Sequence, residues 1–361
     1  MERIDTHVHC VPDVWREACL KYGHGCPDGM PAIPQWDTTT HLALMDELSI
    51  TRSILSITSP GTHLKRLASS EMASLTAATN DALSAICAAH PSRFSFFASL
   101  PLPDVPASLA EIDRVFGDNP LPGVAGFCLM TNAHGAYLGD KALDPIFDAL
   151  SARQAVVFMH PTTCHAAHAP LRGPSGGSAD AAATAVDDGA EDAIRPLAQY
   201  PSPMLEFFFD TTRAVANLLL SGTVSRCPGI TFIAPHAGAA LPPLAERFGQ
   251  FASVIYGAQP PGGLAGGDGV KRVLRDRFFF DLAGFPFPDQ IHGLLRLVGP
   301  DRMLYGSDFP YTPRPSVVGL AERMRVGLRE LFDEGMAARI ECGNARALFG
   351  GSGAGAGRSA L

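Results

Sequence analysis

Long apolar runs and basic clusters are both absent from this chain of 361 residues. No uninterrupted apolar stretch reaches the roughly 18 residues of a membrane-spanning helix, so we expect no membrane span. Charged residues make up only 18% of the chain and the formal net charge is −8, which argues against a nucleic-acid partner. Residues 1–5 contain no basic segment before an apolar one, and we therefore expect no secretory leader.

Close cysteine pairs are missing as well. The eight cysteines are scattered along the chain, and none of them forms a Cys-x-x-Cys pair. In a chain of this length that scatter is typical of reduced thiols rather than of a disulfide framework, so we expect a cytoplasmic protein. Hydrophobic residues make up 46% of the sequence, which is enough for a large buried core and excludes a disordered protein.

Short apolar runs alternate with amphipathic stretches over most of the chain. The runs predict eight strands, at residues 3–9, 52–58, 94–100, 124–130, 155–160, 230–235, 278–283 and 303–306. Their nearly continuous hydrophobicity is typical of strands that are buried on both faces of a parallel sheet. The amphipathic stretches predict helices at residues 39–48, 70–90, 107–116, 145–152, 212–221, 242–251, 288–298, 315–331 and 335–348.

This alternation predicts an α/β fold, a (β/α)8 TIM barrel that occupies residues 1–349 as a single domain. An open doubly wound sheet is the alternative, and it is disfavoured because no Gly-x-Gly-x-x-Gly motif follows an early strand. Two long loops interrupt the pattern, at residues 12–37 after strand one and at residues 161–203 after strand five. Residues 350–361 are rich in Gly and Ser and are predicted to form a flexible tail.

Possible metal ligands stand at the ends of several predicted strands, and in a barrel these ends meet at the mouth that carries the active site. His7 and His9 are two residues apart on strand one and point to the same side. His160 ends strand five, His236 follows strand six and Asp308 follows strand eight. Imidazoles and a carboxylate in one ring suit a divalent metal such as zinc. The alternative is a polar plug of hydrogen-bonded core histidines.

In these motifs the sequence resembles the amidohydrolase superfamily and, within it, the branch of metal-dependent decarboxylases. The resemblance covers essentially the whole chain and is carried by residues 4–9, 36–37, 45–46, 91–94, 100–101, 158–161, 210–212, 235–238, 306–310 and 343–345. It implies that His7, His9, His160 and Asp308 bind one divalent metal ion per chain, Zn²⁺ in the first place and Mn²⁺ as the alternative. A lysine that bridges two metals in other branches is missing at residues 126–130, the end of strand four.

The resemblance implies a carbon–carbon lyase that acts on a small aromatic carboxylate. The expected reaction is the non-oxidative decarboxylation of an ortho-hydroxy acid of the 6-methylsalicylate or hydroxybenzoate type, with release of carbon dioxide. His236 and Asp308 are the candidate proton carriers, and the sequence does not choose between them. Hydrolysis of a lactone or amide on the same barrel is the alternative reaction, and a non-catalytic barrel is disfavoured because no member of the ring is missing.

Further residues are candidates for substrate contact. Arg247 matches an arginine that, in the amino-carboxymuconate-semialdehyde decarboxylases, reaches the neighbouring subunit and holds a substrate carboxylate, so the resemblance also implies a homodimer. A surface ion pair is the alternative for Arg247. Phe285 and Phe309, together with Tyr311, follow strands seven and eight and are candidates to flank an aromatic ring, with plain packing as the alternative. Residues 27–35 contain no arginine, which favours a mono-carboxylate substrate.

Overall fold

A computed structural model describes residues 2–165, 197, 199–256, 264 and 266–350 of the chain. Its main sheet has eight parallel strands in the order β1-β2-β3-β4-β7-β8-β9-β10. The bounds are Arg3–His9 for β1, Ile50–Ser56 for β2, Phe94–Ala98 for β3, Val124–Met130 for β4, Val156–His160 for β7, Thr231–Ala234 for β8, Phe278–Asp281 for β9 and Met303–Leu304 for β10.

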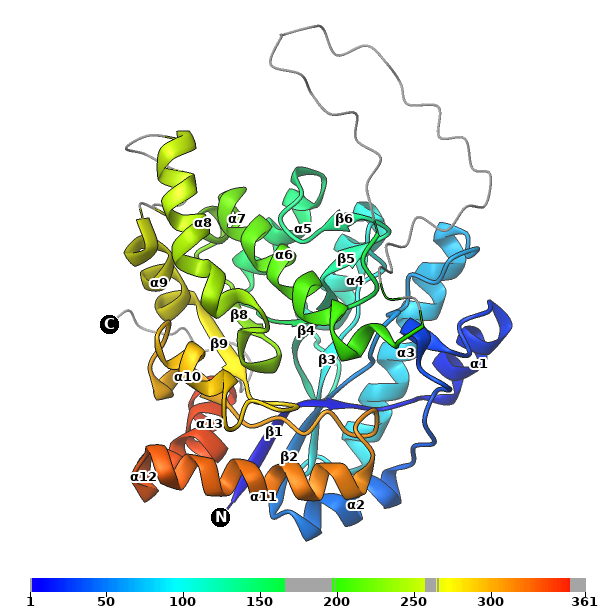
Figure 1. Cartoon of the computed structure of the whole chain (residues 1–361). Helices are drawn as coiled ribbons and strands as arrows, with labels where there is room; N and C mark the ends of the chain where they lie inside the picture. Colours follow the sequence, from blue (N-terminus) through cyan, green and yellow to red (C-terminus); the bar gives the residue numbers. More distant parts are fainter. Residues whose placement is uncertain (1, 166–196, 198, 257–263, 265, 351–361) are drawn as a thin grey trace, which may run out of the picture.

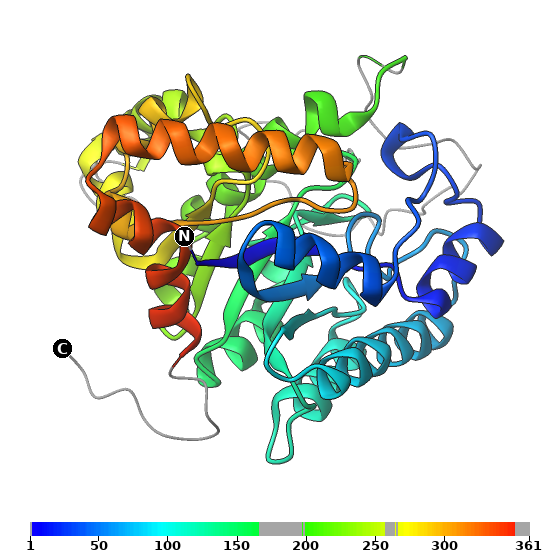
Figure 2. The same ribbon diagram turned by 90° about the horizontal axis from the view of Figure 1, so that it is seen from below.

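Backbone hydrogen bonds close this sheet into a barrel. The amide of Thr6 in β1 donates to the carbonyl of Tyr305 at 3.0 Å, and the amide of Ser307 donates back to the carbonyl of His7 at 3.1 Å. These bonds join the first strand to the segment that follows the last strand. The helices lie around the outside of the strands (Figures 1 and 2). The predicted (β/α)8 barrel is therefore confirmed.

The surrounding helices are those that the amphipathic stretches predicted, with shifted ends. Their bounds are Thr38–Glu47 for α2, Ser69–Ala89 for α3, Val105–Phe116 for α4, Asp144–Ala152 for α5, Glu206–Leu220 for α6, Leu241–Tyr256 for α8, Gln290–Leu295 for α10 and Arg314–Leu331 for α11. The predicted last helix consists of α12 (Glu334–Ala338), a π-helical turn (Arg339–Gly343) and α13 (Asn344–Phe349). Among the described residues, no helix combines the length and apolar character that crossing a bilayer requires.

The apolar core has two layers. Side chains that point into the barrel, such as Ile4, Phe97 and Phe158, form an inner cluster that Leu348 of α13 covers from one end. A second and larger cluster fills the space between the strands and the outer helices. The barrel is thus filled by side chains below its mouth, and polar residues at the carboxyl ends of the strands are held on a rigid, closely packed base.

Several short elements differ from the sequence prediction. The loop at residues 12–37 contains a helix, α1 (Asp13–Lys21), whose Trp15 is buried. A two-stranded hairpin, β5 (Asn132–Ala133) and β6 (Ala136–Tyr137), follows β4, and a short helix, α7 (Thr223–Arg226), follows α6. The helix α9 (Gly266–Arg277) was also missed. Within the second long loop, residues 173–189 form a low-complexity run of mainly Gly, Ala and Asp, and this run lies outside the described residues. The predicted tail, apart from Gly350, also lies outside them.

Candidate metal centre

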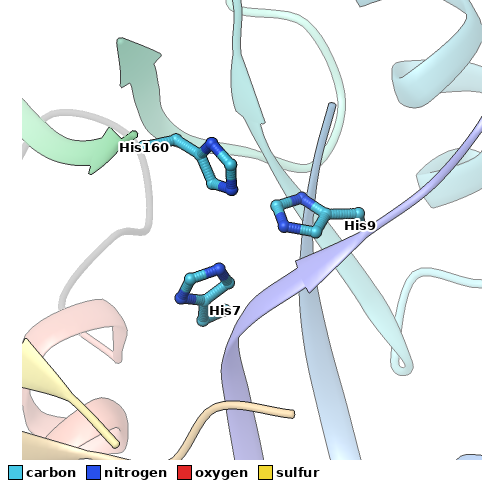
Figure 3. Close-up of side chains that lie close together, drawn as sticks. All are labelled: His7, His9 and His160. Carbon is cyan, nitrogen blue, oxygen red and sulfur yellow. The ribbon is translucent and has the colours of Figure 1, made fainter. Parts of the chain in front are cut away.

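Three histidines from two strands meet at the mouth of the barrel. His7 and His9 come from β1 and His160 ends β7, and each offers one ring nitrogen such that these atoms all lie within 4.8 Å of one another. Figure 3 shows the three rings turned toward one another. The side chains are 0%, 0% and 2% exposed, so polar ring atoms have been taken out of water here. The expected convergence of these residues is present.

Hydrogen bonds fix the tautomers of His7 and His9. His7 donates from Nδ1 to Oδ2 of Asp281 at 3.0 Å. His9 donates from Nδ1 to the hydroxyl of Ser56 at 3.0 Å, because that hydroxyl itself donates to the carbonyl of Val8. In both rings Nε2 therefore keeps its lone pair, and both Nε2 atoms are buried with no hydrogen-bond partner. Buried polar atoms without a partner are costly unless something binds them.

His160 is oriented in the same way. Its Nδ1 donates to the carbonyl of Pro161 at 2.7 Å, which leaves the Nε2 lone pair directed elsewhere. The hydroxyl of Thr58 lies 3.4 Å from that Nε2. Histidines that ligate a metal typically donate their other ring nitrogen to a carboxylate, a carbonyl or a hydroxyl. All three histidines show this arrangement, so the residues present fit a divalent cation.

Asp308 completes the ring from the segment after β10. Its Oδ1 atom lies 3.3 Å from Nε2 of His9 and 3.6 Å from Nε2 of His7, without the geometry of a hydrogen bond. The backbone of Asp308 has a φ of 59°, a left-handed conformation that costs free energy for a non-glycine residue. A bond of 2.8 Å from its amide to the carbonyl of His7 holds this turn and aims the carboxylate at the histidines.

His236 follows β8 and lies beside His7 and Asp308. The ring centroids of His7 and His236 are 4.8 Å apart, and one atom each of His7, His236 and Asp308 lie within 4.8 Å of one another. The Nδ1 atom of His236 is buried and has no hydrogen-bond partner. The ring is stacked on Phe208 at 5.8 Å between centroids. His236 is thus placed to act on a molecule that lies beside the metal position.

Burial and the neighbouring carboxylates together set the charges of this group. Burial lowers the pKa of His9 and His160, and it lowers the pKa of His236 to about 4, with repulsion from His7 as a further cause. For His7 burial alone would lower the pKa, but Asp281 and Asp308 raise it. For Asp308 burial alone would raise the pKa, but His9 and His7 outweigh it and the pKa of the carboxyl falls well below its ordinary value. Imidazole nitrogens beside an ionised carboxylate are a donor set that suits a borderline divalent metal.

Asp281 is a functional residue that sequence reasoning missed. It ends β9, a strand of three phenylalanines, and its side chain is fully buried. Besides His7, it accepts the amides of His236 and Ala283, each at 3.1 Å. Burial would raise its pKa, but the electrostatic interaction with His7 and the hydrogen bond from its ring dominate, and the pKa is lowered. The available signal was a polar residue at the end of an apolar strand, the same signal that pointed to His160.

An apolar cavity of about 250 Å³ opens above the metal position. His160, His236 and Asp308 form its polar floor, and its walls are mainly aromatic and thioether side chains, contributed by Met30, Met204, Phe207, Phe208, Phe285 and Tyr311. No Lys or Arg among the described residues lines it. A planar aromatic molecule with an oxygen-bearing edge fits these surroundings.

Two of the residues predicted to contact the substrate lie away from the cavity of this chain. Phe309 is 4% exposed, and its ring packs on His41 at 5.3 Å rather than lining the cavity. Arg247 is exposed on α8, where its guanidinium lies over the ring of Phe251 at 4.9 Å. Phe285 and Tyr311 do line the cavity, as expected. The structure therefore brings the predicted ligands and His236 together, and leaves Phe309 and Arg247 outside.

Comparison with known proteins agrees with this geometry. The sequence profile described as amidohydrolase matches residues 4–351. The chain belongs to the amidohydrolase family. The 6-methylsalicylic acid decarboxylase acuB of Aspergillus aculeatus is 33% identical over 320 residues, which is 88% of this chain and 86% of that protein. The predicted family and its decarboxylase branch are confirmed.

Solved structures of the family share the fold of this member. The crystal structure of an amidohydrolase II is 30% identical and superposes with a TM-score of 0.79 over 97% of this chain and 100% of that chain. A dihydroxybenzoic acid decarboxylase from Polaromonas sp. JS666, with bound manganese and the inhibitor 2-nitroresorcinol, is 21% identical with a TM-score of 0.72 over 97% of each chain. At that identity the second likeness concerns the fold alone.

Proposed function

We propose that this amidohydrolase-family chain is a metal-dependent, non-oxidative decarboxylase of a small aromatic ortho-hydroxy acid of the 6-methylsalicylate or hydroxybenzoate type. The observation that carries the proposal is the convergence of three oriented Nε2 atoms and one carboxylate on the floor of an apolar cavity. The relatives named 6-methylsalicylic acid decarboxylase support the reaction class, a carbon–carbon lyase.

His7, His9, His160 and Asp308 are the residues that would hold one divalent ion per chain. Zn²⁺ is the first candidate because of the imidazole-rich donor set, and Mn²⁺ is the second. The inward end of β4 offers Cys128 and Met130 and no lysine, which supports one ion rather than two. When bound, such an ion supplies Lewis-acid polarisation of a substrate oxygen and lowers the pKa of a phenolic hydroxyl.

The cavity walls would hold the substrate ring. Phe208, Phe285 and Met30 offer apolar surface on which an aromatic ring and a methyl substituent can pack. Because no cationic side chain of the described residues lines the cavity, a second carboxylate on the substrate would have no partner within this chain. The walls therefore favour a mono-carboxylate with apolar substituents.

His236 is the better placed of the two candidate proton carriers. Its pKa of about 4 keeps the ring neutral at neutral pH, so it can take up the proton that leaves the substrate hydroxyl. The same proton can then be delivered to the ring carbon that bears the carboxylate, after which the carbon–carbon bond breaks and carbon dioxide leaves. The neighbouring histidines hold the pKa of Asp308 well below its ordinary value, so this carboxyl stays ionised and has no proton to deliver.

Arg247 would serve a second copy of the chain in a homodimer. Its helix α8 also exposes Phe251, Val254 and Ile255, which are 52%, 82% and 69% exposed. An apolar helix face beside an arginine is the composition of an interface core. Light scattering during size-exclusion chromatography tests the dimer, and Arg247→Ala tests whether the arginine acts on the substrate. The cytoplasmic location stays a prediction.

An activity screen tests the proposed function. The purified chain is depleted of metal, reloaded with Zn²⁺ or Mn²⁺, and incubated with salicylate, 6-methylsalicylate and dihydroxybenzoates. We expect carbon dioxide in the headspace and the matching phenol in equal amount, and only after reloading. Release of an acid from lactones or amides, without carbon dioxide from any aromatic acid, would replace the decarboxylase with the hydrolase.

A further inference from the structure

The first turn of α6 forms one wall of the cavity over the candidate metal centre. Phe207 and Phe208, which we call the aromatic wall, both line the cavity. The ring of Phe208 is stacked on that of His236 with 22° between their planes, and the ring of Phe207 lies 6.2 Å from that of His160. The position of this turn therefore decides which surface a substrate meets and how the His236 ring is held.

A fully buried carboxylate, Asp210, follows the aromatic wall on the same helix. Its Oδ1 atom accepts a hydrogen bond from the hydroxyl of Tyr137. Its Oδ2 atom accepts hydrogen bonds from the hydroxyl of Thr131 and, at 3.1 Å, from the amide of Asn132. Arg213 is the nearby cation, at 4.0 Å and 47% exposed, so hydroxyl and amide donors provide most of the contacts that hold this charge.

The donors to Asp210 belong to the segment that runs beside His160. The amide of Thr131 donates to the carbonyl of His160 at 2.8 Å, and the hydroxyl oxygen of Thr131 accepts the amide of Thr162 at 3.2 Å. The side chain of Asn132 also donates to the carbonyl of Thr163 at 3.2 Å. One carboxylate thus links α6 both to the β5–β6 hairpin and to the backbone around a candidate metal ligand, as the neighbouring positions of α6, β5 and β6 in Figure 1 illustrate.

We propose that Asp210 is a positioning residue, which holds the aromatic wall over His236 and so fixes the ring that would move the proton. Asp210 neither lines the cavity nor belongs to the candidate ligand groups, so it can affect the reaction only through the residues that do. In this sense the proposal rests on the proposed function. Hydrogen bonds to an ionised acceptor are about twice as strong as those between neutral groups, which makes a buried carboxylate an effective anchor. Burial and the charge of Asp210 raise the pKa of Tyr137, so its hydroxyl stays protonated and remains a donor.

A second tether on α6 provides a matched control. The side chain of Asn217, about two helical turns beyond Asp210, donates to the carbonyl of Leu138 at 3.0 Å and to Oδ1 of Asp140 at 3.1 Å. It joins the same helix to the same hairpin region, but far from the aromatic wall. Asn217→Ala therefore loosens the docking of the helix without releasing its first turn.

Asp210→Asn keeps the size of the side chain, removes its charge and turns one acceptor into a donor. We expect kcat/KM for the aromatic acid to fall roughly 10- to 100-fold, the effect of one or two lost hydrogen bonds to a charged group, at unchanged metal content. Tyr137→Phe removes a single donor and should give a smaller loss. Asn217→Ala, even at an equal loss of Tm, should leave kcat/KM within about twofold of wild type. An equal loss of activity in Asn217→Ala would reduce Asp210 to a general stabilising residue.

A double-mutant cycle tests the route through the aromatic wall. In a Phe208→Ala background, Asp210→Asn should have little further effect on kcat/KM, because its target has been removed. Additive losses would overturn the proposal. Hydrogen–deuterium exchange over residues 206–213, measured without substrate, should rise in Asp210→Asn and not in Asn217→Ala. If the wild type decarboxylates no aromatic acid, the proposed function fails while the exchange result still decides the positioning role.

Discussion

The Nδ1 atom of His7 lies 3.0 Å from the Oδ2 atom of Asp281, and both side chains are completely buried. This bond sets the tautomer of His7 and aims its free Nε2 at the metal position. The other oxygen of Asp281 accepts the backbone amide of His236. A single carboxylate at the end of β9 therefore orients the ring of one candidate ligand, His7 of β1, and holds the backbone of the candidate proton carrier, His236, which follows β8.

Asp281→Asn should weaken metal binding without removing a ligand. The amide is neutral and lowers the basicity of His7, so we expect the affinity for Zn²⁺ to fall about 10- to 100-fold. Titration against a competing chelator measures the affinity directly. The exposed Asp289, whose replacement by Asn also removes one carboxylate after β9, is the control and should leave the affinity unchanged. An Asp281→Asn protein that competes as well as wild type would show that this carboxylate does not tune the site.

The ligands and the proton carrier should respond differently to substitution. His7→Ala and Asp308→Ala each remove a donor from the ring, so we expect loss of both bound metal and turnover. His236→Ala should abolish turnover while metal content survives, because His236 lines the substrate cavity and is not one of the four candidate ligands. Inductively coupled plasma mass spectrometry and the carbon dioxide assay on the same samples separate the two outcomes. A His236→Ala protein with near wild-type rates would remove His236 from the mechanism.

The ligands on the strands were predictable from the sequence because strand geometry is regular. Contacts made beyond a turn, or between segments far apart in the sequence, were not predictable. His7 and His9 share a side of β1 by simple alternation, and this parity needs no tertiary information. Phe309 shows the limit: the left-handed turn at Asp308 breaks the alternation, so the direction of the next side chain cannot be counted from the strand. Asp210 meets donors more than seventy positions earlier in the sequence, which no local pattern specifies.

Local composition also hid some helices. In residues 12–37 the glycines and prolines of the second half masked the short helix α1. Three glycines near the start of α9 argued against a helix there, since glycine disfavours helix interiors. The structure gives the reason for two of the glycines in this region, Gly249 of α8 and Gly267 of α9, because each lies where a Cβ would contact the other helix. Close packing of α8 on α9 overrides propensity.

His41 should make the fold sensitive to acid. Its ring is fully buried, accepts the indole N–H of Trp36 at Nδ1 (3.0 Å) and lies 3.3 Å from the hydroxyl of Ser53 at Nε2. Burial lowers its pKa to about 3, whereas this histidine in the unfolded chain titrates near its ordinary value of 6.5. Below about pH 6.5 the unfolded chain takes up a proton at His41 that the folded protein does not bind. No stability is lost for this reason above about pH 6.5, and the free energy of unfolding falls as the pH drops toward 3, by up to about 1.4 kcal/mol per pH unit.

His41→Gln isolates this contribution. Glutamine can accept from Trp36 and donate to Ser53 at every pH, so the free energy of unfolding of the variant should depend less on pH between about 6 and 4. Urea unfolding of metal-free wild type and variant across that range gives the comparison, and the other titrating groups cancel in the difference. Parallel curves for the two proteins would show that His41 does not carry the acid sensitivity.

Gly249 and Gly267 should differ in their tolerance of alanine, although both lie at the contact of α8 and α9. A Cβ at Gly249 would stand 2.7 Å from the carbonyl oxygen of Gly266 and 2.9 Å from a methyl group of Val270, and neither the backbone nor the buried valine can yield easily. At Gly267 the obstacle is the carboxylate of Glu246, the exposed end of a flexible side chain that can rotate away.

We therefore expect Gly249→Ala to lower the free energy of unfolding by roughly 1–3 kcal/mol, the usual cost of overpacking. Gly267→Ala should be close to neutral, because the higher helix propensity of alanine offsets the displaced ion pair between Glu246 and Lys271. Thermal and urea unfolding of the two variants measure the contrast. Equal stability of both variants would contradict the close approach of the two helices.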